Sequence, residues 1–160
     1  MLNREYDQVC SVARSLEVLG ERWTLLVIRD VFNGKRRFDA IQRDLGVARN
    51  VLAARLSRLV AEGILEKRRY SERPTRYEYF LTGKGLDLWP VMVAMMHWGD
   101  RYLADAGAPL VIHHKECGGT VDERGCCERC GARLEARDAY AEPGPGSDAT
   151  APAVARADTV

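Results

Sequence analysis

Apolar residues in the first part of the chain recur at steps of three and four positions. The members of this pattern are Val12, Leu16, Leu19, Trp23, Leu26, Val27, Val31 and Phe32. Residues at this spacing share one face of an α-helix, so the pattern predicts helix on both sides of Gly20. The pair Asn33-Gly34 is typical of a turn and predicts the end of this helical region.

Two shorter apolar patterns follow, and each closes at a glycine. The first predicts a helix over 38–45 that stops at Gly46, and the second predicts a helix over 49–62 that stops at Gly63. Their apolar positions are Phe38, Ile41, Leu45, Leu52, Leu56, Leu59 and Val60. Two helices joined by a short turn that contains glycine are typical of a helix-turn-helix.

The next two segments, 64–70 and 75–81, are rich in β-branched and aromatic residues. Pro74 lies between them and suits a turn, so the pair predicts a β-hairpin, which in this position is a wing. Thr82 then predicts the N-cap of a long helix to about Ala104. Pro90 should kink that helix unless its true start lies later.

The predicted helix over 82–104 is apolar on two faces. The two stripes are Leu86, Trp89, Val93 and Met96, and then Leu88, Met92, Met95 and Tyr102. We expect the first stripe to pack on the chain's own domain and the second to be covered by a second copy of the chain. The alternative is a helix buried on both sides within one chain.

Beyond Pro109 the pattern changes again. Residues 110–113 read as a short strand, the segment to about Tyr140 is rich in glycine and cysteine, and residues 141–160 hold almost no core-forming side chains. The predicted fold is therefore mainly α with a small β component. It comprises a winged helix-turn-helix with a long dimerisation helix over 1–108, a Cys-rich β-ribbon over 109–140 and a disordered tail over 141–160.

Composition adds a partner class. The 160 residues contain no apolar run of the roughly 18 residues that cross a bilayer, and no secretion signal, so we expect a soluble, cytoplasmic protein without a membrane partner. The net charge of +1 is unevenly distributed. Residues 35–76 hold twelve lysines and arginines against five acidic residues, whereas residues 113–160 hold six basic and nine acidic residues. The basic middle favours a polyanionic partner.

Eight short motifs occur along the chain in one order. They are Leu19-Gly20-Glu21-Arg22-Trp23, Arg37-Phe38-Asp39-Ala40-Ile41, Leu52-Ala53-Ala54-Arg55-Leu56, Gly63-Ile64-Leu65, Pro74-Thr75-Arg76-Tyr77-Glu78-Tyr79, Leu81-Thr82-x-x-Gly85, Leu88-Trp89-Pro90-Val91 and His97-Trp98-Gly99. From Cys10 to about Tyr102 the chain resembles the HxlR family of winged helix-turn-helix transcriptional regulators, relatives of the MarR group. The chain departs from this resemblance at Ala48, where family members often have a serine that caps the recognition helix.

The resemblance implies double-stranded DNA as the partner, and the helix over 49–62 would enter its groove. Our candidate DNA-binding residues are Arg37, Arg49, Asn50, Ala54, Arg55, Ser57, Arg58, Arg68, Arg69, Arg73 and Arg76. Small side chains let a helix approach the groove floor, Asn suits adenine, and Arg binds guanine or phosphate. Lys35 and Arg36 are expected to grip the phosphate backbone. The alternative for each is an ordinary solvated surface residue.

We expect a homodimer on a pseudo-palindromic operator, with repression as the outcome. A winged-helix module for protein interactions, or a redox or metal sensor with a zinc-ribbon extension, is the alternative. Cys10 precedes the first predicted helix, where a helix dipole favours thiolate. The resemblance adds that some family members sense oxidants or electrophiles through a cysteine at this place. An oxidant or a small molecule is therefore the expected effector, although a lone cysteine is also a common small apolar residue.

The Cys-rich segment predicts a candidate structural zinc site. Cys127-x-x-Cys130 followed by glycine suits one tetrahedral metal, and Cys117 with His113 would complete the ligand set. His114 or Cys126 are alternatives, and reduced thiols without metal are the simpler interpretation. The same segment imitates the His-x-Glu…Cys-x-x-Cys signature of zinc deaminases, but its spacing is too short. No catalytic set is otherwise apparent, so we do not expect an enzyme.

Overall fold

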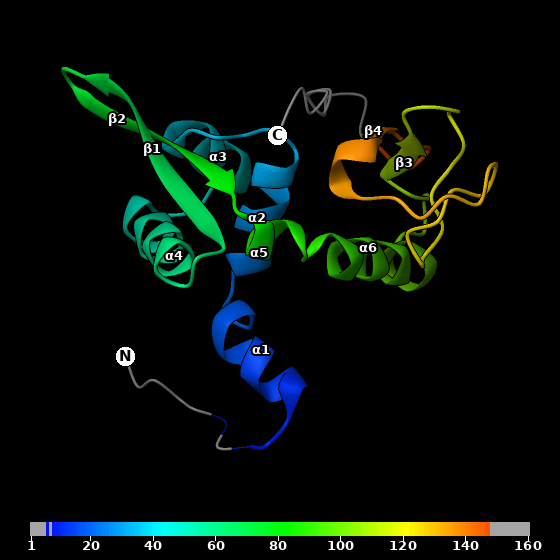
Figure 1. Ribbon diagram of the computed structural model, residues 1–160, viewed down its shortest axis with the longest axis horizontal. Coiled ribbons are helices and arrows are strands. Elements are labelled where there is room, and N and C mark those ends of the chain that lie inside the picture. The colour runs from blue at the N-terminus through cyan, green and yellow to red at the C-terminus, as the bar shows by residue number, and fades with distance from the viewer. Residues whose placement is uncertain (1–5, 7, 148–160) are drawn as a thin grey trace. The chain divides into compact units, whose positions relative to one another are not determined.

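The computed structural model describes residue 6 and residues 8–147 of the chain, and it divides between Gly85 and Leu86 into two compact units (Figure 1). This boundary falls before the long helix, whereas the domain limit expected from the sequence, 108/109, stays a prediction. The reason lies in α6 (Trp89–Leu103), whose Val93 is buried in the core of the C-terminal unit. The long helix thus belongs with the Cys-rich segment.

The first unit contains the predicted winged helix-turn-helix. Its elements are α1 (Ser11–Leu19), α2 (Thr24–Phe32), α3 (Phe38–Leu45), α4 (Arg49–Ala61), β1 (Leu65–Glu72) and β2 (Thr75–Leu81), followed by α5 (Gly83–Leu86) at the boundary. The central core residues are Val27, Ile28, Ile41, Leu52, Leu56, Leu59, Ile64 and Leu65. Strands β1 and β2 pair antiparallel, and the hairpin extends away from α3 and α4 (Figure 1).

Glycine and proline set the limits of two helices. Gly46 ends α3 with φ of 61°, a left-handed conformation that is strained for other residues, and its N–H donates to the Gln42 carbonyl over 2.9 Å. The expected helix over 82–104 is interrupted: the Thr82 hydroxyl accepts the Gly85 N–H over 3.1 Å and caps α5, whereas α6 begins later. Pro90 therefore lies in the first turn of α6, where its missing N–H has no helical partner to lose.

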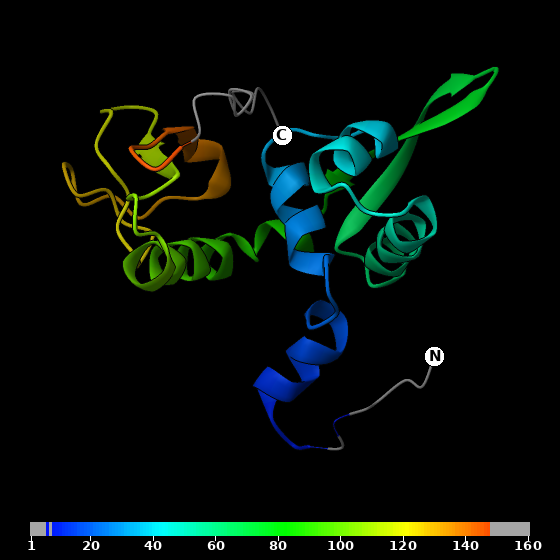
Figure 2. The same ribbon diagram turned by 180° about the vertical axis from the view of Figure 1, so that it is seen from behind.

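The second unit combines α6 with two short strands. Strand β3 (Leu110–His114) pairs antiparallel with β4 (Ala139–Pro143), and a single 3₁₀ turn, η1 (Ala136–Asp138), precedes β4. Figure 2 shows these strands and the Cys-rich loops on one side of α6. The unit's buried core consists of Val93, Ile112, Val121, Cys127, Leu134 and Ala139, with Trp89, Met96 and Cys117 packed against it. The first of the two predicted apolar stripes was expected to pack on the chain itself, and this is confirmed at Trp89, Val93 and Met96.

The predicted disorder from residue 141 is wrong for the first part of that segment. Ala141 pairs with Ile112 inside the β3–β4 ladder, and the Gly144 N–H donates to the Pro109 carbonyl over 2.9 Å. Backbone pairing of this kind needs no large apolar side chain, which is why composition missed it. The remainder of the predicted tail, 148–160, lies outside the described residues. Among residues 6 and 8–147, no helix combines the length and hydropathy that crossing a bilayer requires.

Candidate nucleic-acid interface and a cysteine–histidine cluster

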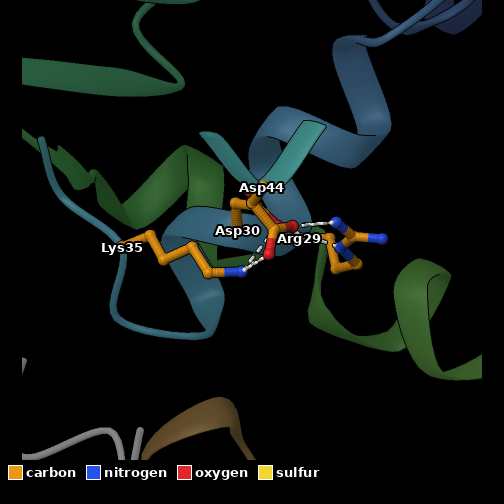
Figure 3. Close-up of polar contacts among 4 residues, drawn as sticks. All are labelled: Arg29, Asp30, Lys35 and Asp44. Carbon is orange, nitrogen blue, oxygen red and sulfur yellow. Dashed lines mark hydrogen bonds and ion pairs between the residues drawn. The ribbon is translucent and has the colours of Figure 1, made fainter. Parts of the chain in front are cut away.

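A four-residue ion cluster fixes α3 against α2 (Figure 3). Asp30 is fully buried and accepts a hydrogen bond from Arg29 Nη2 over 2.7 Å. Asp44 on α3 lies 2.6 Å from Lys35 Nζ and 2.9 Å from Arg29 Nη2. In Figure 3 the two carboxylates lie between the guanidinium and the ammonium. Lys35, which we expected to grip DNA, is therefore engaged inside its own unit.

The pKa values of the two carboxyl groups in this cluster are shifted in opposite directions. Burial raises the pKa of Asp30 above its ordinary value, and the hydrogen bond from Arg29 only partly offsets the effect. Burial also acts on Asp44, but the Lys35 ammonium outweighs it and holds the pKa of Asp44 below its ordinary value. A single proton therefore prefers Asp30, which reduces the repulsion between the two groups.

Helix α4 presents a small, polar surface opposite its apolar face. Leu52, Leu56 and Leu59 are buried, whereas the predicted outer residues are exposed; these are Asn50, Ala54, Ser57 and Arg58. Arg58 Nε lies 3.0 Å from Glu62 Oε1, one turn further along the helix. The side chain of Arg58 remains 44% exposed, so this contact leaves its guanidinium accessible to a ligand.

Three of the predicted DNA-binding arginines form ion pairs with residues of other elements or loops of the first unit. Arg55 is 17% exposed, and its Nε donates to the Arg22 carbonyl over 3.2 Å, while its guanidinium also pairs with Glu21. Arg37 Nε lies 2.9 Å from Glu78 Oε1, and Arg49 Nη1 lies 3.2 Å from Asp39 Oδ1. Arg55 is thus directed into the fold, whereas Arg37 connects the start of α3 to β2 and Arg49 connects α4 to α3, and both stay exposed.

The four arginines of the hairpin fall into two groups, one with acidic partners and one without them among the described residues. Arg68 is paired with Glu66, and its guanidinium also lies 4.3 Å from the centre of the Phe80 ring, while Arg69 lies 3.2 Å from Glu72. Arg73 and Arg76 are exposed near the tip, and neither forms an ion pair within the described part of the chain. The tip therefore carries positive charge that the chain itself does not neutralise.

Four side chains of the second unit converge on one point. Their ligand atoms lie within 4.8 Å of one another, and the residues are His114, Cys117, Cys127 and Cys130. The structure thus brings together the three cysteines that the sequence suggested, with His114 in place of His113. His113 is the neighbouring residue on β3, so its side chain points to the other face and stacks on the Tyr140 ring at 5.3 Å.

The remaining cysteines are separate from this cluster. Cys126 is half-buried, and its N–H donates to Asp122 Oδ1 over 2.8 Å. Cys10 is exposed immediately before α1, where its carbonyl accepts the Arg14 N–H. Within the cluster, N–H groups of Cys130 and Arg129 directed at the Cys127 sulfur lower the pKa of that thiol to about 6.

Comparison with known proteins assigns the helix-turn-helix together with α6 to a family. The model of the HxlR-like helix-turn-helix family matches residues 18–106, more than half of the chain. The chain belongs to the HxlR-like family. HxlR-like proteins are DNA-binding transcriptional regulators, and the expected winged helix-turn-helix fold is confirmed.

Individual relatives of this HxlR-like chain agree with the assignment. It is 46% identical over 137 residues to the uncharacterised HTH-type transcriptional regulator Rv3095 of Mycobacterium tuberculosis, covering 85% of this chain and 87% of that one. The crystal structure of PA1607, a candidate transcription factor, is 36% identical with a TM-score of 0.67, covering 84% and 94% of the two chains. The redox regulator HypR in its reduced form is 30% identical with a TM-score of 0.54, covering 57% and 92%.

The extent of these matches separates the two parts of the HxlR-like chain. The family match ends at residue 106, before the four converging residues begin at His114. The match to HypR likewise covers little more than half of the chain, whereas the match to PA1607 covers 84% and therefore extends into the Cys-rich segment. The cluster is thus an addition to the helix-turn-helix rather than part of it.

Proposed function

We propose that this protein is a sequence-specific transcriptional repressor that binds a pseudo-palindromic operator as a homodimer. The observation that carries the proposal is the exposed face of α4. Its apolar side is anchored in the core, so Asn50, Ala54, Ser57 and Arg58 are held on a rigid surface of major-groove width. In this proposal the dimer represses by occupying promoter DNA.

The side chains divide the recognition task between base edges and phosphates. Asn50 suits a bidentate contact with adenine, and Arg58 suits guanine once its guanidinium exchanges Glu62 for the base. Ala54 and Ser57 are small enough for the backbone of α4 to approach the groove floor. Arg73 and Arg76 at the wing tip suit phosphates or a minor groove, since no acidic partner neutralises them among the described residues.

Arg55 is withdrawn from the proposed contact set because its guanidinium is occupied inside the fold. Arg37 and Arg49 stay in it as positioning residues whose exposed guanidinium groups also reach phosphates. Arg68 and Arg69 contribute less than the tip arginines, since Glu66 and Glu72 lie beside them.

A second copy is proposed as the cover for apolar surface on α6 and α1. On α6 the exposed large apolar residues are Val91, Met95, Trp98, Tyr102 and Leu103, and on α1 they are Val12 and Leu16. Val91, Met95, Trp98 and Tyr102 recur at steps of three and four positions, so these four residues form one continuous stripe on α6. Exposed stripes of this kind mark interaction surfaces, and self-association would cover them.

Selection of bound fragments from random duplex DNA, followed by titration of the selected operator, tests the proposal. We expect Arg58→Ala to weaken operator binding by more than about tenfold, since a base-reading pair contributes 1–3 kcal/mol. Arg133→Ala removes the same charge from the Cys-rich unit and serves as the matched control. Equal affinities for wild type and Arg58→Ala would remove this face of α4 from the interface.

The dimer is tested separately by sedimentation. Trp98→Glu places a charge in the middle of the α6 stripe and should yield a monomer at concentrations where the wild type sediments as a dimer. Tyr77→Glu, at an exposed aromatic residue on the wing, is the control and should leave the dimer intact. A wild-type protein that is monomeric throughout would contradict the proposed homodimer.

Oxidant control through Cys10 is a second proposed layer, favoured by the exposure of this thiol before α1. HypR has been observed in reduced and oxidised forms and is named a redox regulator. Treatment with diamide should change operator affinity in the wild type and leave Cys10→Ser unaffected. A response that persists in Cys10→Ser would assign the oxidant sensitivity to another cysteine.

A further inference from the structure

The four converging residues of the second unit occupy two matching loops. In each loop two ligand residues are separated by two positions and followed by glycine: His114-x-x-Cys117-Gly118 and Cys127-x-x-Cys130-Gly131. The Gly118 N–H donates to the His114 carbonyl, and the Gly131 N–H donates to the Cys127 carbonyl, both over 2.8 Å. Gly118 and Gly131 have φ of 68° and 74°. The chain therefore builds the same tight turn twice and directs both turns at one point.

The four ligand atoms lie close enough together to surround one ion, and their distances exclude a disulfide bond in this state. Cys117 Sγ lies 3.3 Å from His114 Nδ1 and 3.4 Å from Cys127 Sγ, and Cys130 Sγ lies 3.3 Å from His114 Nδ1. Ligands about 2.3 Å from a central zinc would be separated by about 3.8 Å along the tetrahedron edges. A disulfide would require sulfur atoms about 2.0 Å apart.

Groups around the cluster orient its ligand atoms. N–H groups of Cys130 and Arg129 point at the Cys127 sulfur, and the Gly119 N–H points at the Cys117 sulfur, so the sulfur atoms are surrounded by donors. A Cβ at position 119 would lie 2.6 Å from Cys127 Sγ, which explains why glycine is needed there. His114 is buried and directs Nδ1 inward, while its Nε2 lies 3.9 Å from the Glu116 carboxylate on the outer side.

We infer that His114, Cys117, Cys127 and Cys130 form a structural Zn²⁺ site. Three sulfur ligands and one nitrogen ligand favour zinc over harder cations, and four protein ligands leave no open position for catalysis. On binding, the cysteine thiols release their protons to solvent and His114 donates a neutral nitrogen lone pair. Because Cys127 is also part of the core around Val93, the ion fastens the Cys-rich loops to α6.

Metal content of the full chain, purified without chelators, tests the assignment. We expect about one zinc per chain in the wild type and a loss of more than about tenfold in Cys127→Ser. Cys126→Ser changes the adjacent residue and should retain the metal. His114→Asn should lose most of the zinc, whereas His113→Asn should keep it.

A second measurement guards against variants that simply fail to fold. Replacement of the bound ion by Co²⁺ in the wild type should give the absorption of a tetrahedral thiolate complex, and added Zn²⁺ should abolish it. Less than about a tenth of an equivalent of zinc after metal loading, equal loss in Cys126→Ser and Cys127→Ser, or an iron–sulfur spectrum would overturn the assignment. Neither measurement involves DNA, so its result is independent of the proposed operator binding.

Discussion

The two units of this chain owe their order to different interactions. Of the ten largest fully buried side chains in the described part of the chain, eight belong to the first unit, and Val93 and Cys127 belong to the second. A small unit with little buried apolar surface usually needs a cross-link to fold. The helix-turn-helix unit is thus held by its apolar core, whereas we expect the unit that contains α6 to depend on the proposed metal as well.

Division of function follows this division of stability. The exposed face of α4 and the wing tip, which we propose to contact DNA, lie in the first unit. The exposed stripe on α6 and the proposed Zn²⁺ site lie in the second unit. Loss of metal would therefore act first on the unit proposed to contribute most to dimerisation, while each helix-turn-helix keeps its fold.

Chelation should give the largest effect that distinguishes the two units. We expect amide exchange at Val121, whose N–H donates to the Ile112 carbonyl, to accelerate by more than about a hundredfold when zinc is removed, since structural zinc contributes many kcal/mol to folding. Exchange at Val27 and Ile28 in α2 should change by less than about twofold. Exchange mass spectrometry with and without chelator measures both regions in one sample.

Restoration by added Zn²⁺ is the control for the chelation experiment, because it separates loss of the ion from a direct effect of the chelator. Equal acceleration in α2 and in the Cys-rich loops would show that the two units unfold together. Unchanged exchange at Val121 would show that the unit is ordered by its apolar contacts alone.

A cavity in the first unit should give the next largest effect. Leu56→Ala removes a side chain that is 1% exposed from the buried face of α4, and we expect a loss of about 3 kcal/mol in the free energy of unfolding. Leu26→Ala on α2 changes a side chain that is 39% exposed and should lose less than about 1 kcal/mol. Amide exchange in α2 and α4, followed as denaturant is added, measures the free energy of unfolding of both variants.

The zinc content should distinguish this cavity from damage to the second unit. Leu56→Ala is expected to keep its full metal content, since its contacts belong to the first unit. A parallel loss of zinc would contradict the separation of the two sources of stability.

The order of elements was predictable because local signals agreed along the first 85 residues. Apolar periodicity, the glycine stops at Gly46 and Gly63, and the turn around Pro74 each specified an element without tertiary information. The division into two compact units could not be predicted, because periodicity shows which face of α6 is buried but not which segment buries it. Strand β4 was missed because its pairing with β3 uses backbone groups.

The site residues were harder to predict than the elements. Arg55 precedes the buried Leu56, and its helical position gave no sign that Glu21 and the Arg22 carbonyl would hold it. His113 and His114 both have metal-ligand spacing to Cys117, and alternation along β3 decides between them. The repeated pattern of ligand, two residues, cysteine and glycine was a usable signal for His114. Asp30, a single acid in the apolar run of α2, was the signal for the ion cluster.

The wing should contribute a modest, sequence-independent share of DNA affinity. We expect Arg73→Ala to reduce the slope of log affinity against log salt concentration by about 1, because one phosphate contact and its counterion release are lost. Arg73→Lys keeps the charge and should keep the slope. Titrations of the operator at several salt concentrations measure this, and equal slopes for Arg73→Ala and the wild type would remove the wing tip from the DNA-binding surface.

The smallest expected effect concerns the pH dependence of the ion cluster in the first unit. Burial raises the pKa of Asp30, so the folded chain holds this proton more tightly than the unfolded chain. The stability from this proton is fully present below the ordinary pKa of 3.8 and is lost as pH rises through the raised value. We expect the thermal midpoint of the wild type, measured against that of Asp30→Asn, to fall as pH rises across this interval.

Asp44→Asn provides a control of opposite sign in the same cluster. Because the pKa of Asp44 is lowered, its contribution is present above 3.8 and is lost as pH falls through the lowered value. The midpoint of the wild type relative to Asp44→Asn should therefore rise with pH. Acid would also displace the proposed metal from the second unit, but it would do so in all three proteins and cancel in the differences. A relative midpoint that rose with pH in both comparisons would mean that the cluster's proton does not prefer Asp30 and that the folded first unit keeps both carboxylates charged.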